Sequence, residues 1–241
     1  MVSKNELKLI TSLRQKKYRD REGLFIAEGP KIIEDFLNAG ASLEKVYALP
    51  GHFEDSPLSI TIDAKALKKM SGLKTPNSAL AIFKKFNNSK PSASGLTLCL
   101  DDIQDPGNLG TIIRLSDWFG INGIVCSPQT VDCYNPKVVQ ATMGSLARVP
   151  LMYTDLAGFL DESTLPVYGG FMQGDAVYAK QLPEDAILVM GNEGNGISEE
   201  IEALVQQKIS IPNMGSGQTE SLNVATATAI LLSEFKRTTG R

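Results

Sequence analysis

Apolar residues follow two spacings along the chain, and each spacing predicts one kind of element. Short apolar runs bounded by Gly, Pro or polar residues are typical of strands, and apolar positions three and four residues apart indicate helices. Before residue 90, each predicted helix ends near a glycine, as helices often do. The predicted strands there are residues 24–29, 45–50, 58–63 and 79–85, and the predicted helices are residues 31–40 and 64–72.

The rest of the chain alternates strand and helix more regularly. Alternating units of this kind predict an α/β fold with a mostly parallel sheet covered on both faces. Ligands of such sheets bind beyond the carboxyl ends of the strands. The predicted strands are residues 95–103, 123–128, 148–154, 165–171, 186–191 and 208–213, and the predicted helices are residues 109–119, 136–143, 156–161, 199–205 and 222–236.

The charge of the chain changes sign at a polar stretch, "NNSKPSASG" (87–95), which has the composition of a linker. Residues 1–95 carry 16 Lys and Arg and 10 Asp and Glu, a net charge of +6, whereas residues 96–241 carry 8 and 17, a net charge of −9. We therefore predict two domains, 1–90 and 91–241. The basic first domain either meets a polyanion or simply carries a lysine-rich solvated surface.

Composition narrows the function classes. The first residues, "MVSKNELKLI", contain no apolar core long enough for a signal peptide, and no apolar stretch approaches the roughly 20 residues of a membrane span, so a cytoplasmic protein is expected. The three cysteines, Cys99, Cys126 and Cys133, show no C-x-x-C spacing and are expected to be reduced and buried. His52 is the single histidine, so no metal site is predicted.

The first chemically unusual loop follows the strand at residues 95–103. It contains the turn "DPGN", which places Asn108 to cap the next helix. On that helix Arg114 points away from the apolar stripe. Arg114 forms either a surface ion pair with Asp117 or a contact with an anion, a substrate oxygen or a partner subunit.

The second loop, "GNEGNGIS", follows the buried strand at residues 186–191. Two glutamates in the first turn of the following helix, which Ser198 is expected to cap, argue against a bound phosphate. The loop predicts a ligand other than phosphate, with a flexible turn as the alternative. Its glycines, Gly191, Gly194 and Gly196, surround Glu193 and would allow close approach of the backbone to a ligand.

The third loop leads into the last helix through "ESLNVATA". Ser221 is expected to be the N-cap. Asn223 is expected at the second helical position with its amide buried between apolar neighbours, so the amide needs a hydrogen-bond partner.

Together the three loops resemble the three motifs of the SpoU/TrmH family of RNA methyltransferases, which belongs to the SPOUT superfamily. Departures from the family pattern are Glu220 before the third motif and Ala225 within it. The matching residues are Asn108, Gly110, Arg114, Phe119 and Gly120, then Gly191, Glu193, Gly194, Gly196 and Ile197, then Ile211, Pro212, Gly215, Ser221, Leu222, Asn223 and Val224.

The segment "RDREGLFIAEGPKIIEDFL" (19–37) is similar to the substrate-binding domain of the same family. Its matching residues are Arg21, Phe25, Glu28 and Gly29. The resemblance implies a small α/β RNA-binding domain like certain ribosomal proteins. It makes Lys17, Arg19 and Arg21 the expected RNA contacts.

The resemblance implies a deep trefoil knot in the second domain, S-adenosyl-L-methionine as the cofactor, and a homodimer. The methyl acceptor would be a ribose 2′-hydroxyl of tRNA or rRNA. The cofactor-binding residues would be Gly191, Gly194, Gly196, Ile211 and Leu222, and the catalytic residues would be Asn108, Arg114, Glu193, Ser221 and Asn223.

Three other functions compete with this one. A nicotinamide-dependent oxidoreductase needs a G-x-G-x-x-G fingerprint after an early strand and an acid about 20 residues later, and neither occurs in order. An RNA-binding protein without methyl transfer, and a methyltransferase acting on a base, both stay open. The sequence identifies neither the RNA nor the nucleotide.

Overall fold

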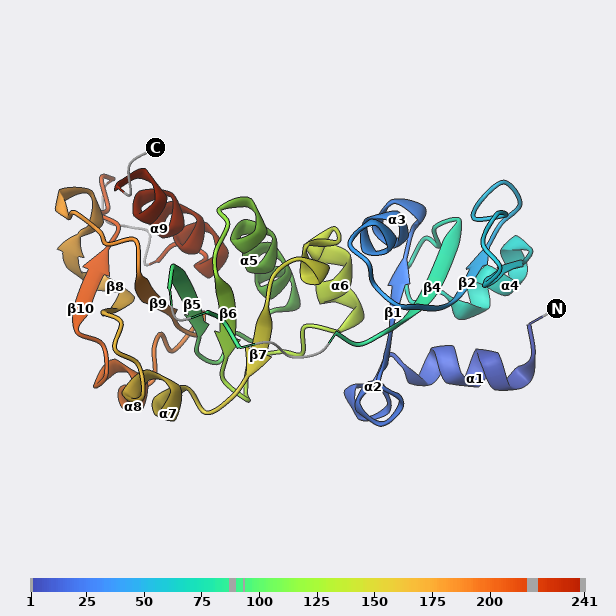
Figure 1. Cartoon of the computed structure of the whole chain (residues 1–241), viewed down its shortest axis with the longest axis horizontal. Coiled ribbons are helices and arrows are strands. Elements are labelled where there is room, and N and C mark those ends of the chain that lie inside the picture. Colours follow the sequence, from blue (N-terminus) through green and yellow to red (C-terminus); the bar gives the residue numbers. More distant parts are fainter. Residues whose placement is uncertain (1, 87–89, 93, 216–220, 239–241) are drawn as a thin grey trace. The chain divides into compact units, whose positions relative to one another are not determined.

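The computed structural model describes residues 2–86, 90–92, 94–215 and 221–238, and the chain forms two compact units (Figure 1). The first unit combines Met1–Asn87 with Asp132–Arg148, and the second combines Asn88–Val131 with Val149–Arg241. The sequence placed residues 132–148 in the second domain. The structure groups them with the first unit instead, because their side chains complete its core.

The first unit is built on a mixed four-stranded sheet. Its order is β1-β4-β2-β3, with β4 antiparallel to both neighbours and β3 parallel to β2. The strands are β1 (Leu24–Glu28), β2 (Leu43–Ala48), β3 (Ser59–Thr61) and β4 (Ala79–Lys84), and the helices are α1 (Lys4–Ser12), α2 (Lys16–Glu22), α3 (Pro30–Asn38), α4 (Ala64–Met70) and α6 (Pro136–Thr142).

Helices α1 and α2 were not predicted from the sequence, although α1 has a recognisable start signal. Ser3 accepts a hydrogen bond from the Glu6 amide, and the Glu6 carboxylate accepts one from the Ser3 amide. This S-x-x-E capping box satisfies two amides that the first turn leaves without partners.

Two apolar layers lie on the sheet of the first unit. One, which includes Ile10 and Leu67, packs beneath α1 and α4. The other is aromatic: the ring of Tyr134 lies 5.0 Å from that of Phe25, centroid to centroid. Three further rings complete this aromatic cluster: Phe36, Phe83 and Phe86. The ring of Tyr134 therefore packs the segment before α6 into the core of the first unit. Burial raises the pKa of the Tyr134 hydroxyl.

A buried ion pair fixes the same segment. Arg19 and Asp132 are 2% and 9% exposed, and Nε and Nη2 of Arg19 donate to Oδ2 of Asp132 at 2.9 and 2.5 Å. Arg19 Nη1 also donates to the carbonyls of Leu13 and Arg14. The prediction that Arg19 contacts RNA is therefore wrong, because its guanidinium is enclosed and its donors are used inside the unit.

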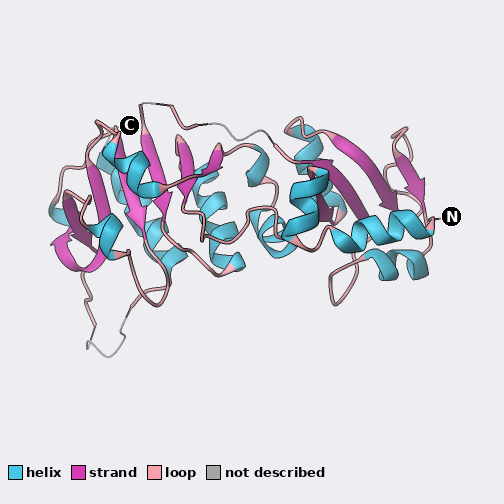
Figure 2. Cartoon of the chain, turned by 90° about the horizontal axis from the view of Figure 1, so that it is seen from below, coloured by secondary structure: helices cyan, strands magenta, loops and turns pink. Residues whose placement is uncertain are grey.

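The second unit contains a six-stranded sheet in which every pairing is parallel, which confirms the predicted α/β class. Helices α5 and α9 lie on one face, and α7 and α8 lie on the other (Figures 1 and 2). The strands, in spatial order, are β10 (Gln207–Ser210), β8 (Val167–Ala176), β9 (Ala186–Met190), β5 (Leu96–Leu100), β6 (Gly123–Cys126) and β7 (Leu151–Tyr153). The helices are α5 (Pro106–Trp118), α7 (Leu156–Asp161), α8 (Glu199–Glu202) and α9 (Val224–Thr238).

The core of the second unit includes two of the three predicted buried cysteines. Cys99 packs with Val125 and Val189 in the layer beneath α7 and α8, and burial raises the pKa of its thiol. Cys126 of this unit and Cys133 of the first unit are also buried, and neither is part of a disulfide, as predicted. A search of the described helices finds none that is both long and apolar enough to cross a membrane.

The strand order creates a switch point at β5. From β5 the chain proceeds to β6 and β7 on one side, and it later returns to place β9 on the other side. The loops that leave β5 and β9 therefore diverge from neighbouring carboxyl ends, which is where open parallel sheets bind ligands.

The Arg19–Asp132 pair gives a stability prediction. Asp132→Ala leaves a buried guanidinium without its carboxylate, which should lower the free energy of unfolding by about 3 kcal/mol in urea denaturation. The control is Arg21→Ala on the same helix, because the Arg21–Glu22 pair is exposed and its loss should cost less than about 1 kcal/mol. Equal losses in the two variants would contradict this assignment.

Candidate active site

One chain of side-chain hydrogen bonds joins the three loops singled out in the sequence. Asn223 Nδ2 donates to Oδ1 of Asn108 at 2.9 Å, and Asn108 Nδ2 donates to Oε1 of Glu193 at 2.9 Å. These residues belong to the segment before α9, the first turn of α5 and the loop after β9. The structure therefore brings together residues 85 and 115 positions apart in the sequence.

The partners at each end fix the orientation of both amides. The Glu193 carboxylate can only accept, so the Asn108 amino group must face it. Oδ1 of Asn223 accepts from the backbone amides of Ala225 (2.9 Å) and Thr226 (3.3 Å), so its amino group must face Asn108. The chain of bonds thus has a single direction, from the start of α9 to the carboxylate.

Further bonds join the loops after β5 and β9. Asn192 Nδ2 donates to the Asp102 carbonyl at 2.8 Å, and the Asp101 carboxylate accepts from the Ser198 amide at 2.8 Å. The Glu193 carboxylate also accepts longer bonds from the backbone amides that follow Ile103, at 3.3 and 3.4 Å. This role of Asp101, Asp102 and Asn192 was not predicted from the sequence, although the paired acids directly after a strand were a visible signal.

Asp102 occupies an unusual backbone conformation at this junction. Its φ is +57°, in the left-handed region that Asp tolerates better than most residues. Strained conformations of this kind concentrate at functional sites, where the surrounding contacts hold them in place.

The glycine loop after β9 is closed rather than open. Asn192 and Gly196 exchange backbone hydrogen bonds of 2.9 Å in both directions. A Cβ on Gly191 would lie 2.2 Å from the Gly196 carbonyl carbon, so only glycine permits this closure, and Gly196 itself has a φ of +73°. The closed form of this loop thus requires Gly191 and favours glycine at position 196, whether or not a ligand uses their backbone.

The structure corrects three predictions about helix starts. Asp105, not Asn108, caps α5, because its carboxylate accepts from the Asn108 amide at 2.8 Å. Asn223, not Ser221, caps α9, which begins at Val224. Asn223 is exposed rather than buried, since it precedes the helix. Ser198 is the N-cap of α8, but its side chain makes no capping bond.

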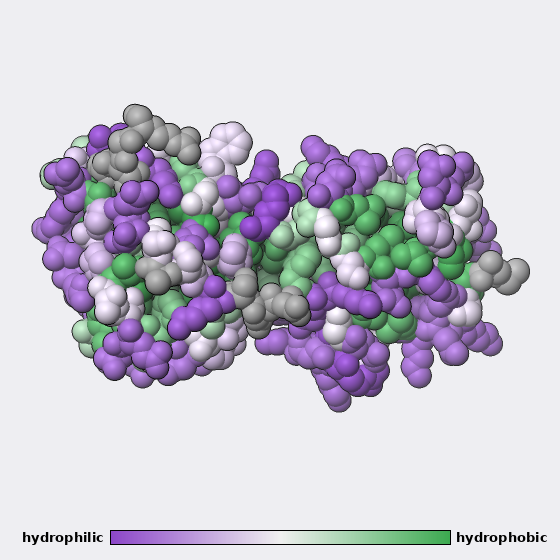
Figure 3. Space-filling view, in the orientation of Figure 1, coloured by the Kyte–Doolittle hydropathy of each residue, from purple (hydrophilic) through white to green (hydrophobic). Residues whose placement is uncertain are grey.

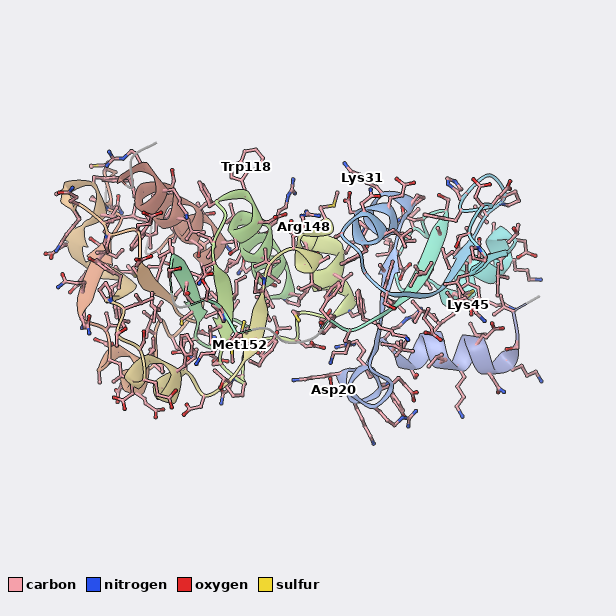
Figure 4. All side chains as sticks on the ribbon, in the orientation of Figure 1. Asp20, Lys31, Lys45, Trp118, Arg148 and Met152 are labelled. Carbon is pink, nitrogen blue, oxygen red and sulfur yellow. The ribbon has the colours of Figure 1, made fainter. Side chains whose placement is uncertain are left out.

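Arg114 is exposed on α5, as its place off the apolar stripe predicted. Within the described ranges it makes no ion pair, so the alternative of a pair with Asp117 is not observed. Trp118, one turn further along, is 83% exposed and points away from the helix (Figure 4). The two side chains share one face of α5 at an i, i+4 spacing.

The predicted cofactor residues border the same loops. Gly194 and Leu222 are exposed and Ile211 is partly buried, whereas Ser221 is exposed beside Asn223. The groups that join the loops are amides, carboxylates and backbone, and apolar Leu222 is 47% exposed next to them. These groups fit a ligand that is partly apolar and positively charged, and they do not fit a phosphate. Glu220 lies outside the described residues, and in the described part no cluster of three His, Cys, Asp or Glu could hold a metal.

Two family models match consecutive parts of the chain. The SpoU rRNA methylase family model matches residues 95–233, and the MRM3-like substrate-binding domain matches residues 4–81. A 23S rRNA (guanosine-2′-O)-methyltransferase, RlmP, of Bacillus subtilis is 30% identical over 230 residues, covering 91% of each chain.

Solved structures give the same result over the whole chain. A putative RNA methyltransferase of the TrmH family from Porphyromonas gingivalis is 39% identical with a TM-score of 0.89, covering 98% of this chain and 99% of its own. An AdoMet-bound rRNA methyltransferase from Sinorhizobium meliloti is 28% identical with a TM-score of 0.85, covering 98% and 97%. The resemblance of the three loops is thus confirmed, and the chain belongs to the SpoU rRNA methylase family.

Proposed function

We propose that this chain transfers a methyl group from S-adenosyl-L-methionine to a ribose 2′-hydroxyl of ribosomal RNA. The observation that carries the proposal is the hydrogen-bond chain Asn223–Asn108–Glu193, which joins the three family motifs at the carboxyl edge of the parallel sheet. Its relative in Bacillus subtilis bears the name of a guanosine-2′-O-methyltransferase of 23S rRNA.

S-Adenosyl-L-methionine supplies an electrophilic methyl group on a positively charged sulfur. We propose that the backbone at Gly191, Gly194, Gly196, Ile211 and Leu222 lines its pocket. We also propose that the C-terminal domain contains the deep trefoil knot of the superfamily. The negative charge of Glu193 favours a positively charged sulfonium ligand. No Lys or Arg takes part in the hydrogen bonds from Asn108, Asn192 and Asn223 named above, so these bonds bring no positive charge that would repel it. The AdoMet-bound relative from Sinorhizobium meliloti supports the same cofactor.

Arg114 is proposed to orient the ribose and to stabilise negative charge as its hydroxyl loses a proton. A guanidinium cannot serve as the base, because its pKa lies above about 12. Its exposed position on α5 leaves its donors available for an oxygen of the RNA. Methyl transfer needs an in-line approach, so fixed placement of the hydroxyl is a large part of the catalysis.

The hydrogen-bond chain Asn223–Asn108–Glu193 would hold this geometry. Asn108 and Asn223 are proposed to fix the start of α5 against the start of α9, and Glu193 to position the ribose or Arg114. Ser221, exposed in the segment before α9, is proposed to contact the substrate.

We propose that the first unit binds the RNA. Lys16, Lys17 and Arg21 are exposed on α2, and Figure 3 shows hydrophilic side chains over α1 and α2. The match of residues 4–81 to a substrate-binding domain supports this role. Lys17 and Arg21 stay proposed RNA contacts, with Arg19 removed from the set.

We further propose that the protein acts in the cytoplasm as a homodimer. The exposed ring of Trp118 supports an interface on α5, because exposed aromatic residues are enriched where proteins associate. Such an interface would place Arg114 near a second copy, so the arginine could act in its own or in the partner's site.

Arg114→Ala tests the catalytic assignment. It should lower methyl transfer to rRNA at least about a hundredfold and change the Kd for S-adenosyl-L-methionine less than about twofold, because it removes a charge-stabilising donor and no cofactor contact. The control is Arg237→Ala, an exposed arginine of the same unit that pairs with Glu234. Transfer at the parental rate would refute the assignment. If alkali still cleaves the RNA at the methylated nucleotide, the methyl group is on a base and the ribose assignment is wrong.

Asn108→Ala tests the hydrogen-bond chain Asn223–Asn108–Glu193. It removes both bonds of Asn108 and leaves Glu193 and Asn223 without their shared partner, so transfer should fall by about tenfold or more. Asn195→Ala is the control, because its side chain lies in the same loop as Glu193 and makes none of these bonds. If the two variants transfer methyl groups equally fast, the hydrogen-bond chain Asn223–Asn108–Glu193 has no catalytic role.

The salt dependence of RNA binding tests the first unit. Combined Lys17→Ala and Arg21→Ala should reduce the slope of log K against log salt by about 0.7 for each lost phosphate contact. Substitution is preferable to removal of residues 1–90, because removal would strip Asp132 of Arg19. The matched control replaces Lys208 and Arg237 of the second unit by Ala. An unchanged slope in the Lys17 and Arg21 variant would refute RNA binding by α2.

A further inference from the structure

The first unit contains a cavity of about 470 Å³ that shares no residue with the candidate active site. Its walls come from distant parts of the sequence: Arg14 before α2, Glu28 at the end of β1, Leu73 after α4, and Gln140 on α6. Every lining residue belongs to the same compact unit. The volume lies in the range of about 300–1,000 Å³ found for small-ligand sites.

The lining combines apolar walls with a few fixed polar groups. Ile26, Leu73, Pro136 and Ala141 supply the apolar surface. A planar aromatic ligand needs surfaces of this kind on its two faces and polar partners along its edge.

Glu28 is the central polar group of the cavity. It is 6% exposed, and its two carboxylate oxygens accept from the Ser71 hydroxyl at 2.5 Å and the Gly72 amide at 2.8 Å. These bonds hold the carboxylate in place, and each oxygen can accept one more bond. A ligand that presents two adjacent N–H donors would satisfy both oxygens.

Cations border the same space. Arg14 is held in position by bonds from one terminal nitrogen to the carbonyls of Met70 (2.8 Å) and Ser71 (2.6 Å), and among the described residues its other nitrogens make no hydrogen bond. Lys137 is exposed at the start of α6. A ligand whose base enters the cavity could thus place a phosphate near a positive charge.

We infer that this cavity binds one unpaired guanine nucleotide of the RNA substrate. Guanine is the RNA base that offers two adjacent N–H groups, N1–H and the N2 amino group, along one edge, which suits the fixed carboxylate of Glu28. Adenine and cytosine offer one amino group, and uracil offers a single N–H between two carbonyls. The amides of Asn135 and Gln140 can serve the guanine carbonyl. Sequence-specific proteins commonly read RNA through such unstacked bases.

The inference rests on the proposed action on RNA, but its test needs no methyl transfer. The full chain is titrated with fluorescent RNA hairpins whose loops contain one unpaired guanosine, inosine or adenosine. Inosine lacks only the N2 amino group, so the guanosine hairpin should bind about tenfold more tightly than the other two. Equal binding of the three hairpins would overturn the inference without any change to the protein.

Variants link this preference to the cavity. Glu28→Gln keeps the shape of the side chain but removes the charge, and Ala141→Leu fills the space; both should abolish the preference for guanosine. Glu34→Gln, which removes one exposed glutamate of α3, is the matched control and should retain it. A preference that survives both cavity variants would overturn the inference, and Ala141→Leu gives this answer even if Glu28→Gln does not fold.

Two further measurements separate the possible failures. If guanosine monophosphate binds and the cavity variants abolish its binding while leaving the hairpins unaffected, the cavity serves a free nucleotide and the inference about RNA is wrong. Transfer of labelled methyl groups from S-adenosyl-L-methionine to rRNA is assayed in parallel. If the parent chain transfers methyl groups but binds the three hairpins equally, only the cavity assignment is wrong, whereas a lack of transfer in the parent chain overturns the proposed function.

Discussion

A parallel sheet sends the carboxyl end of every strand to the same edge, and the candidate active site depends on this constraint. Divergence of the chain on the two sides of β5 opens space there, and polar side chains from the neighbouring loops fill it. Asn108 is the residue on which they converge, since it donates to Glu193 and accepts from Asn223. An amide suits this place because it carries a donor and an acceptor on one rigid group.

Much of this architecture could be predicted from the sequence, because buried parallel strands are continuous apolar runs. The strands of the second unit and the class of fold follow from those runs. The three loops were recognised because glycines and polar residues directly follow strands. Their contacts could not be predicted, since Asn108 meets residues 85 and 115 positions away, and spacing alone does not encode such pairings.

The wrong predictions have two causes. Asn223 was expected inside α9, and Asn108 was expected to cap α5. Both errors arose because Asn, Asp and Ser compete for the same capping position and helix boundaries are uncertain by a few residues. Arg19 was expected to contact RNA because of the family resemblance, and arginine usually lies at the surface. Its burial follows from Asp132, a partner 113 residues away that no local pattern reveals.

The grouping of residues 132–148 with the first unit affects the order in which the protein can be completed during synthesis. The ribosome releases Arg19 long before Asp132, and strands β5 and β6 lie between them in the chain. Until that segment emerges, the guanidinium lacks its carboxylate and the aromatic cluster lacks Tyr134. The first unit therefore reaches its final core only after part of the second unit has been made, when the ribosome has synthesised more than half of the chain.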